Sequence, residues 1–145
     1  MLFELVATLC AGLFAGAAVY VTLVEHPARL ECGTEVATTE FGPSYRRASV
    51  MQASLAALGL VAAVVAWVQG RGVVVLFAGV LLGIAIPFTL LIILPTTKRL
   101  LDPALDGSSA EAAGLLKRWG RLHTVRSVAS TLAFGLLLWH AVMSS

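Results

Sequence analysis

Four stretches of the chain are long and apolar enough to cross a bilayer. These stretches are Leu5–Val24, Val50–Val68, Val73–Leu94 and Ser127–Met143. The first three have no charged residue, and the last has no Asp, Glu, Lys or Arg and one histidine, His140. A membrane helix needs roughly 20 mostly apolar residues. The pattern therefore predicts an all-α protein, a bundle of four transmembrane helices with spans near residues 3–25, 45–69, 72–95 and 118–142.

The connection between the first two spans contains two prolines that suggest a separate helix. Pro27 suits the first turn of a new helix, and Gly42-Pro43 is typical of a helix boundary. We therefore predict a short interfacial helix over Ala28–Phe41, with the second span beginning near Ser44.

The second half of the chain has its own start and stop signals. Pro87 should kink the third span because it removes a backbone donor, and an extramembrane loop is expected after Pro95. Ser108 and Glu111 match a capping box, so the last helix should begin there, well before its apolar run.

Composition supports one integral membrane domain over residues 1–145. The chain is 59% hydrophobic and 12% charged, with mean hydropathy +0.91, whereas soluble domains average about 25% charged residues. All the Lys and Arg residues except Arg71 fall at one end of the predicted bundle. The positive-inside rule makes that end cytoplasmic, with both termini outside a bacterial cytoplasmic membrane. Topology and contact with the lipid bilayer explain the basic residues, so no nucleic-acid partner is expected.

Polar residues recur on one face of the last helix. At about 100° per residue, one narrow wedge holds Trp119, His123, Arg126 and Ser130, while Lys117, Arg118 and Arg121 lie on the far side. Ionisable side chains within membrane spans face the bundle interior and mark functional sites by default. The wedge is therefore expected to face inward.

The other spans carry similar faces at the same depth. In each of these spans, polar residues lie near the end predicted to be cytoplasmic, and small residues follow on the same face toward the middle of the membrane. The polar residues are Glu25, Tyr45, Ser49, Gln52, Thr89 and Thr96. Four such faces predict a pocket for a hydrophobic small molecule, polar at a mouth toward the cytoplasmic side and apolar below. In the alternative interpretation these groups only bond one another and fix helix register, with Arg126 pairing with Glu25.

A metal site is a weaker hypothesis. His26, His123 and Glu25 are the residues that could hold a metal, but no HxxxH or ExxH spacing is present. The cofactor stays unknown and none is favoured. His140 stands alone in the last span and is assigned to the membrane interface.

Three segments carry a resemblance to a known family. "GLFAG" in the first span, "IPFTLLIILPTTKRLL" in the third and "LLKRWGRLHTVRSVAS" in the fourth resemble the anthrone oxygenase-like family of small four-helix membrane proteins. The resemblance implies addition of O₂ to a lipophilic, acidic aromatic substrate, anthrone- or quinol-like, without flavin or haem.

That activity gives the polar residues candidate roles. His123 is the first choice of base and Glu25 the second, and Arg126 would stabilise the oxyanion. Substrate binding is assigned to Tyr45, Ser49, Gln52, Thr89, Thr96, Trp119 and Ser130.

Two other functions stay open at this stage. The chain could be a non-enzymatic small-molecule or lipid-binding protein or accessory subunit, or a metal- or haem-dependent membrane enzyme. A homo-oligomer that shares the pocket is a further alternative, because four short helices enclose little volume.

Overall fold

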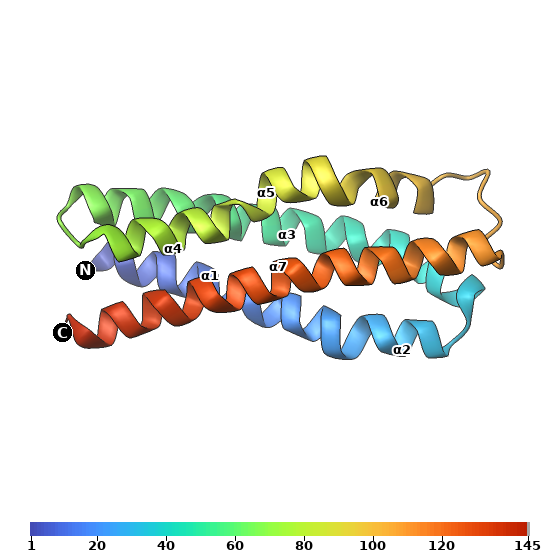
Figure 1. Cartoon of the computed structure of the whole chain (residues 1–145), viewed down its shortest axis with the longest axis horizontal. Coiled ribbons are helices and arrows are strands. Elements are labelled where there is room, and N and C mark those ends of the chain that lie inside the picture. Colours follow the sequence, from blue (N-terminus) through green and yellow to red (C-terminus); the bar gives the residue numbers. More distant parts are fainter. Residues whose placement is uncertain (145) are drawn as a thin grey trace.

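Four antiparallel helical rods packed along one axis, with their connections, make up the described part of the chain. The structure, a computed structural model, describes residues 1–144, and Figure 1 shows both termini at the same end of the bundle. We call that end, with the turn at residues 69–72, the terminal end. The opposite end, with Cys32–Gly33 and residues 101–109, is the loop end.

Nine helical elements make up the four rods of the described chain. In order they are α1 (Leu2–Tyr20), η1 (Val21–Glu25), α2 (His26–Glu31), α3 (Thr34–Val68), α4 (Val73–Gly83), α5 (Ala85–Phe88), η2 (Thr89–Ile93), α6 (Leu94–Leu100) and α7 (Ala110–Met143). The rods, residues 2–31, 34–68, 73–100 and 110–143, are each long and apolar enough to cross a membrane. The prediction of an all-α bundle with four spans is confirmed.

The separate interfacial helix predicted over Ala28–Phe41 is wrong. The first rod continues to Glu31, the chain turns at Gly33 with φ +91°, and α3 then runs through Gly42-Pro43 without a break. Glycine takes that φ without strain, which makes Gly33 the natural turning point. Pro43 costs α3 a backbone hydrogen bond, but Phe41 beside it is fully buried. Tertiary packing therefore outweighs the local helix-breaking signal.

The third rod is broken where the sequence predicts a kink. Helix α4 ends at Gly83, and α5 and the π-helical η2 follow Ile84. Pro87 has no N–H for the Gly83 carbonyl, which explains the interruption. Figure 1 shows the ribbon narrowing between α4 and α5. The kink prediction is confirmed, and the break displaces the second half of the rod from the first.

The connection to α7 is shorter than the sequence suggests. Helix α6 carries Pro95 in its first turn and continues to Leu100, so the loop begins later than predicted. Ser109, not Ser108, caps α7, because its Oγ accepts the Ala112 N–H at 3.1 Å. The prediction that the last helix begins in this segment is confirmed, but the residue that caps it is one position later than predicted.

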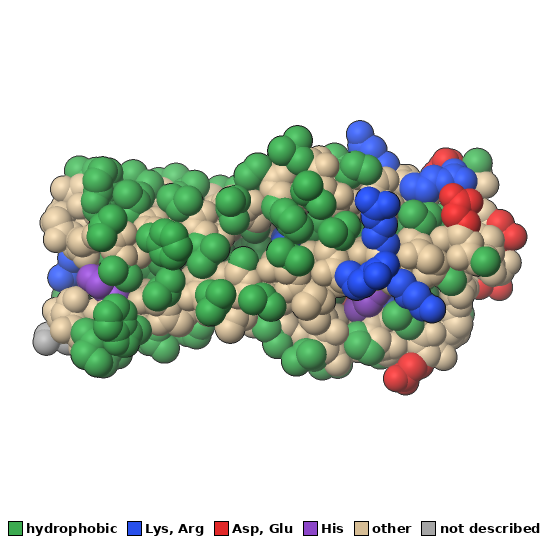
Figure 2. All heavy atoms as spheres, viewed as in Figure 1, with side chains coloured by type: hydrophobic (Ala, Val, Ile, Leu, Met, Phe, Trp, Pro, Cys, Tyr) green, Lys and Arg blue, Asp and Glu red, His purple; other side chains and the backbone are tan. Residues whose placement is uncertain are grey.

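Packing differs between the two halves of the bundle. Small residues line the terminal half, where a Cβ added to Gly79 would collide with Ala63 of α3. The loop half is filled by large side chains, including Phe41, Leu116 and Trp119. In Figure 2 apolar side chains cover much of the surface, while Lys and Arg gather toward the loop end and acidic side chains lie at its tip.

His140 is not solitary, contrary to the sequence interpretation. Its Nδ1 lies 2.6 Å from Oε1 of Glu4, whose Oε2 is 3.0 Å from Nε of Arg71. Glu4 is only 3% exposed. This terminal clasp (Glu4, Arg71 and His140) ties the first and last rods to the α3–α4 turn.

Candidate functional site

A buried guanidinium lies near the middle of α7. Arg126 is 8% exposed, and its Nη2 donates to Oε1 of Gln52 on α3 at 2.8 Å. Its Cζ lies 5.4 Å from the centre of the Phe14 ring. No carboxylate pairs with it in residues 1–144, and its Nε has no hydrogen-bond partner there. A buried cation with so few partners is costly unless it serves a ligand.

A pocket of about 330 Å³ opens beside this guanidinium. We call it the arginine pocket; its lining residues are Phe14, Tyr45, Ser49, Val50, Gln52, Ala53, Ala56, Ala85, Ile86, Thr89, Leu90 and Arg126. The break in the third rod supplies one wall through α5 and η2, and α3 supplies the opposite one. Val50 and Leu90 are strongly exposed apolar side chains. The pocket therefore reaches the apolar side of the bundle between these two residues, while Tyr45 and Ser49 line its part nearer the loop end.

The structure divides the sequence-predicted site residues into groups. Five of them line the arginine pocket, namely Tyr45, Ser49, Gln52, Thr89 and Arg126. Thr96 and Ser130 are buried away from it, and the Ser130 hydroxyl donates to the Ser127 carbonyl at 3.1 Å. Glu25, Trp119 and His123 also lie outside the pocket lining.

Glu25 has a local partner instead of Arg126. Its carboxylate accepts hydrogen bonds from Arg29, one turn later on the same rod, and from Ser44 of α3. Arg29 also pairs with Glu40, with 2.7 Å between Nε and Oε2. The hypothesis of a Glu25–Arg126 pair is wrong, and Glu25 is committed to joining the first rod to α3.

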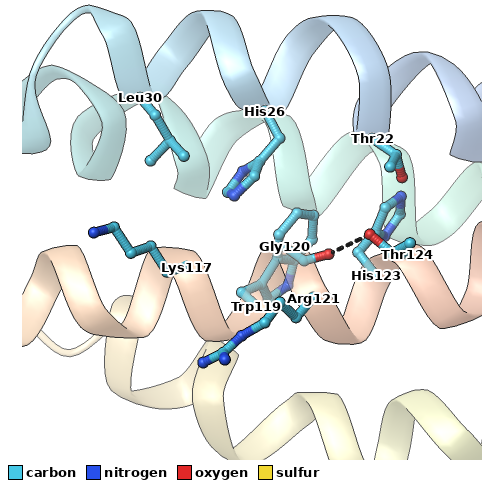
Figure 3. A pocket seen from close by; sticks show the side chains of 9 residues that line it. All are labelled: Thr22, His26, Leu30, Lys117, Trp119, Gly120, Arg121, His123 and Thr124. Atoms are coloured by element: carbon cyan, nitrogen blue, oxygen red, sulfur yellow. Dashed lines mark hydrogen bonds between the residues drawn. The ribbon is translucent and has the colours of Figure 1, made fainter.

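His123 belongs to an aromatic cluster between α7 and the first rod, one turn before Arg126. The Trp119 indole stacks on the His123 ring with centroids 4.8 Å apart, and the His26 ring lies 5.3 Å from Trp119. Figure 3 shows the three rings meeting between the first rod and α7. Nε2 of His123 is 3.3 Å from the Ala18 carbonyl. A carbonyl only accepts, so this contact places the proton on Nε2 and leaves the Nδ1 lone pair free.

The alternative metal ligands do not converge. Both imidazoles pack on Trp119, while the Glu25 carboxylate faces Arg29 and Ser44. Among residues 1–144 no group of three His, Cys, Asp or Glu side chains could hold a metal ion.

A small void, with several polar side chains among its lining residues, lies between the aromatic cluster and the arginine pocket. Its volume is about 20 Å³, and its lining includes His123 and Trp119 on one side. It shares Tyr45, Ser49, Gln52 and Arg126 with the arginine pocket. One water molecule needs roughly 10–15 Å³ of such space and several polar partners. The void therefore has room for a water that joins the imidazole to the pocket.

The start of α7 is anchored by the loop at residues 101–109. Ala104 N–H and the Arg99 guanidinium both bond Asp102, and they lower the pKa of its carboxyl. Ser108 lowers the pKa of Asp106 through hydrogen bonds from its hydroxyl and backbone N–H. Arg99 also bonds Glu111 in the first turn of α7 at 2.7 Å. These contacts fix the helix that carries both His123 and Arg126.

Comparison with protein-family models decides the family. The model described as anthrone oxygenase matches residues 41–136. The chain belongs to the anthrone oxygenase family. No curated protein matches the chain, and no solved structure does.

The segment matched by the anthrone oxygenase model covers most of α3, the whole third rod and most of α7. Residues 41–136 contain most of the arginine pocket, together with Trp119 and His123. The first rod, with Phe14, Glu25 and His26, lies before the match. The resemblance noted in the sequence is therefore confirmed for the segment that carries Arg126.

Two contributors to the site were not identified from the sequence. Phe14 forms part of the arginine pocket, and Arg29 neutralises Glu25. Phe14 could have been found, because it follows Ala11 by three residues and precedes Ala18 by four, on the same inward face. Arg29 carried a usable signal too, since it stands four residues after Glu25.

Proposed function

We propose that the chain is a membrane-embedded oxidoreductase that adds O₂ to a small hydrophobic aromatic molecule, anthrone- or quinol-like, in the arginine pocket. The observation that supports this most is Arg126: a buried guanidinium, without a carboxylate partner in residues 1–144, on the wall of a mostly apolar cavity. Membership of the anthrone oxygenase family supports an oxygenase-type reaction.

The pocket suits a flat lipophilic substrate that becomes an anion. Its volume of about 330 Å³ lies in the range of small-molecule sites, and Phe14, Ile86 and Leu90 offer apolar surface. The mouth between Val50 and Leu90 admits substrate and O₂ directly from the bilayer. Arg126, held by Gln52, would bind the substrate oxygen and stabilise the enolate that forms on loss of a proton.

The proposed reaction balances without a cofactor. A base removes a proton from the carbon opposite the substrate carbonyl, and that carbon then forms a C–O bond with O₂. The peroxide anion takes up a proton to give a hydroperoxide. Its O–O bond breaks as hydroxide leaves and the same carbon loses its second hydrogen as a proton. The products are a quinone and water, so O₂ oxidises the anthrone and is itself reduced.

His123 is the proposed base, and it would act through one water. The imidazole does not line the arginine pocket, but it borders the void that shares Gln52 and Arg126 with it. Its free Nδ1 is the acceptor that a proton relay needs. The proton would therefore pass from the substrate to His123 through one water, without direct contact between the imidazole and the substrate.

Oxygen uptake by purified protein supplied with an anthrone tests the proposal. Arg126→Gln should lower kcat/KM by about 10²–10³-fold, as loss of an oxyanion donor does, and His123→Ala by about 10²–10⁴-fold. Arg118→Gln is the matched control, because Arg118 is an exposed cation on the same helix outside the pocket. Uptake that stays at the uncatalysed rate with wild-type protein would reject the oxygenase.

One observation favours a second function, ligand binding without turnover. The arginine pocket has no carboxylate or imidazole in its lining, so neither His123 nor Glu25 would contact a bound substrate directly. A binding protein would saturate with an anthraquinone, with affinity dependent on Arg126, yet consume no O₂. The His123→Ala variant separates the two functions, because only the oxygenase needs the imidazole.

A further inference from the structure

A second hollow lies on the opposite side of α7. This seam groove, of about 460 Å³, runs between the first rod and α7 and is lined in part by Thr22, His26, Lys117, Arg121 and Thr124. In Figure 3 Lys117 reaches into the gap between the rods, and His26 points from the first rod toward α7. The groove shares no residue with the arginine pocket.

An apolar trough of about 300 Å³ continues the groove toward the terminal end. Thr22 and Thr124 line both hollows, and the trough is walled by residues such as Leu23, Val128 and Leu132. These three side chains are 69%, 55% and 58% exposed, so they face lipid. Groove and trough together form one channel with a cationic part and an apolar part.

The cationic part contains polar groups that lack partners. Lys117 and Arg121 form no ion pair within residues 1–144. His26 is 6% exposed, and although the Leu116 backbone lies near its ring, neither ring nitrogen makes an aligned hydrogen bond. Gly120 permits this placement, because a Cβ there would lie 2.5 Å from Nε2 of His26. A buried polar side chain without a partner calls for a ligand or water.

We propose that the groove and trough bind one anionic phospholipid of the surrounding bilayer. Its phosphate would lie against Lys117 and Arg121, outside the buried His26 ring, and one acyl chain would follow the trough past Leu23 and Val128. Two cations at headgroup depth attract an anionic lipid, and exposed apolar walls leading away from them suit its tail. A phospholipid is favoured over a water-soluble anion because the trough is open to lipid along its length.

The site is independent of the oxygenase proposal but borders it at two residues. Trp119 and His123 line both the seam groove and the small void beside the arginine pocket. The bound headgroup would therefore pack against the far face of the Trp119–His123 stack.

Native mass spectrometry of the detergent-solubilised protein, titrated separately with phosphatidylglycerol, phosphatidylcholine and oleate, tests the site. One phosphatidylglycerol should bind in preference to phosphatidylcholine. Each basic residue near an anionic surface is worth about a fivefold change in affinity, so Lys117→Gln/Arg121→Gln should weaken the first binding event about 25-fold. The matched control, Lys98→Gln/Arg118→Gln, removes equal charge from exposed positions outside the groove and should retain most of the binding.

A second variant tests the tail. Val128→Phe narrows the trough without altering charge and should weaken phosphatidylglycerol binding while the protein stays monodisperse. Equal losses in the two charge variants would overturn the proposal, because binding would then follow net charge alone. Equal affinity for phosphatidylcholine, or preference for oleate over phosphatidylglycerol, would overturn it as well.

Discussion

Replacing Arg126 by methionine should abolish function while leaving the fold intact or more stable. Insertion scales put the cost of an arginine in the middle of a membrane helix at about 2.5–3.5 kcal/mol. Arg126 recovers part of this through its 2.8 Å hydrogen bond to Gln52 and its position over the Phe14 ring. A hydrogen bond to a charged group contributes about 1.5–3 kcal/mol, and the cation–π contact about 0.5–2 kcal/mol.

The methionine variant loses these two stabilising contacts, but it no longer buries a charge in the membrane, which stabilises it. Methionine keeps a sulfur–aromatic contact with Phe14 worth about 0.3–1.5 kcal/mol. Leaving the Gln52 carbonyl without its donor is already included in the lost hydrogen bond. Losses of about 2–5 kcal/mol and gains of about 3–5 kcal/mol nearly cancel, so Arg126→Met should change stability by no more than about 1 kcal/mol. Adding Gln52→Leu removes the orphaned amide and should raise stability by about 1–2 kcal/mol over Arg126→Met alone.

Thermal unfolding in detergent, followed by tryptophan fluorescence, measures both variants. For a chain of this size about 1 kcal/mol corresponds to roughly 2–4 °C in Tm. The expected pattern is an unchanged Tm for Arg126→Met, a higher Tm for the double variant, and loss of substrate-dependent O₂ uptake in both. A fall of more than about 10 °C in Arg126→Met that Gln52→Leu does not restore would show that Arg126 is needed for the fold and not for a ligand.

Three further substitutions test other parts of the structure. Ala53→Phe places a large ring at the mouth of the arginine pocket. It should raise KM at least about tenfold, because overpacking costs about 1–3 kcal/mol. Its control, Ala57→Phe on the exposed face of α3, should leave KM and kcat unchanged. Gly120→Ala should lower the free energy of unfolding by about 1–3 kcal/mol, because the added Cβ would collide with the buried His26 ring. Its control, Gly114→Ala, adds a Cβ in open space and should raise the free energy of unfolding by up to about 1 kcal/mol. Thermal unfolding measures both. Glu4→Gln should weaken the terminal clasp and lower the free energy of unfolding by about 1–3 kcal/mol, while O₂ uptake is retained. Loss of O₂ uptake at an unchanged Tm would contradict a structural role for Glu4.

Helical periodicity was sufficient to place the inward face of α7. Trp119, His123, Arg126 and Ser130 are all buried, while Lys117 on the far side is exposed, as predicted. This succeeds because the angle between residues of one helix depends only on local geometry. The division of these residues between two hollows could not be predicted, because it depends on which neighbour each side of α7 faces.

Non-local pairing was the least predictable feature. Glu25 is the last residue of the π-helical segment η1, and such a segment adds a residue and rotates the positions at its end away from the regular face. Its partner is Arg29 on the same rod, since a cation four residues away needs no tertiary contact to reach it. Glu4 and His140 meet from opposite ends of the chain, and periodicity carries no information about such a contact.

Photo-affinity labelling with an azido-anthraquinone in the native bilayer, followed by peptide mapping, tests the central claim most directly. We expect labels on the α3 segment around Ala53 and on α5–η2 around Ile86 and Leu90, and their loss in Arg126→Met. Labels confined to the seam between the first rod and α7, or labelling of α5–η2 that Arg126→Met leaves unchanged, would contradict it.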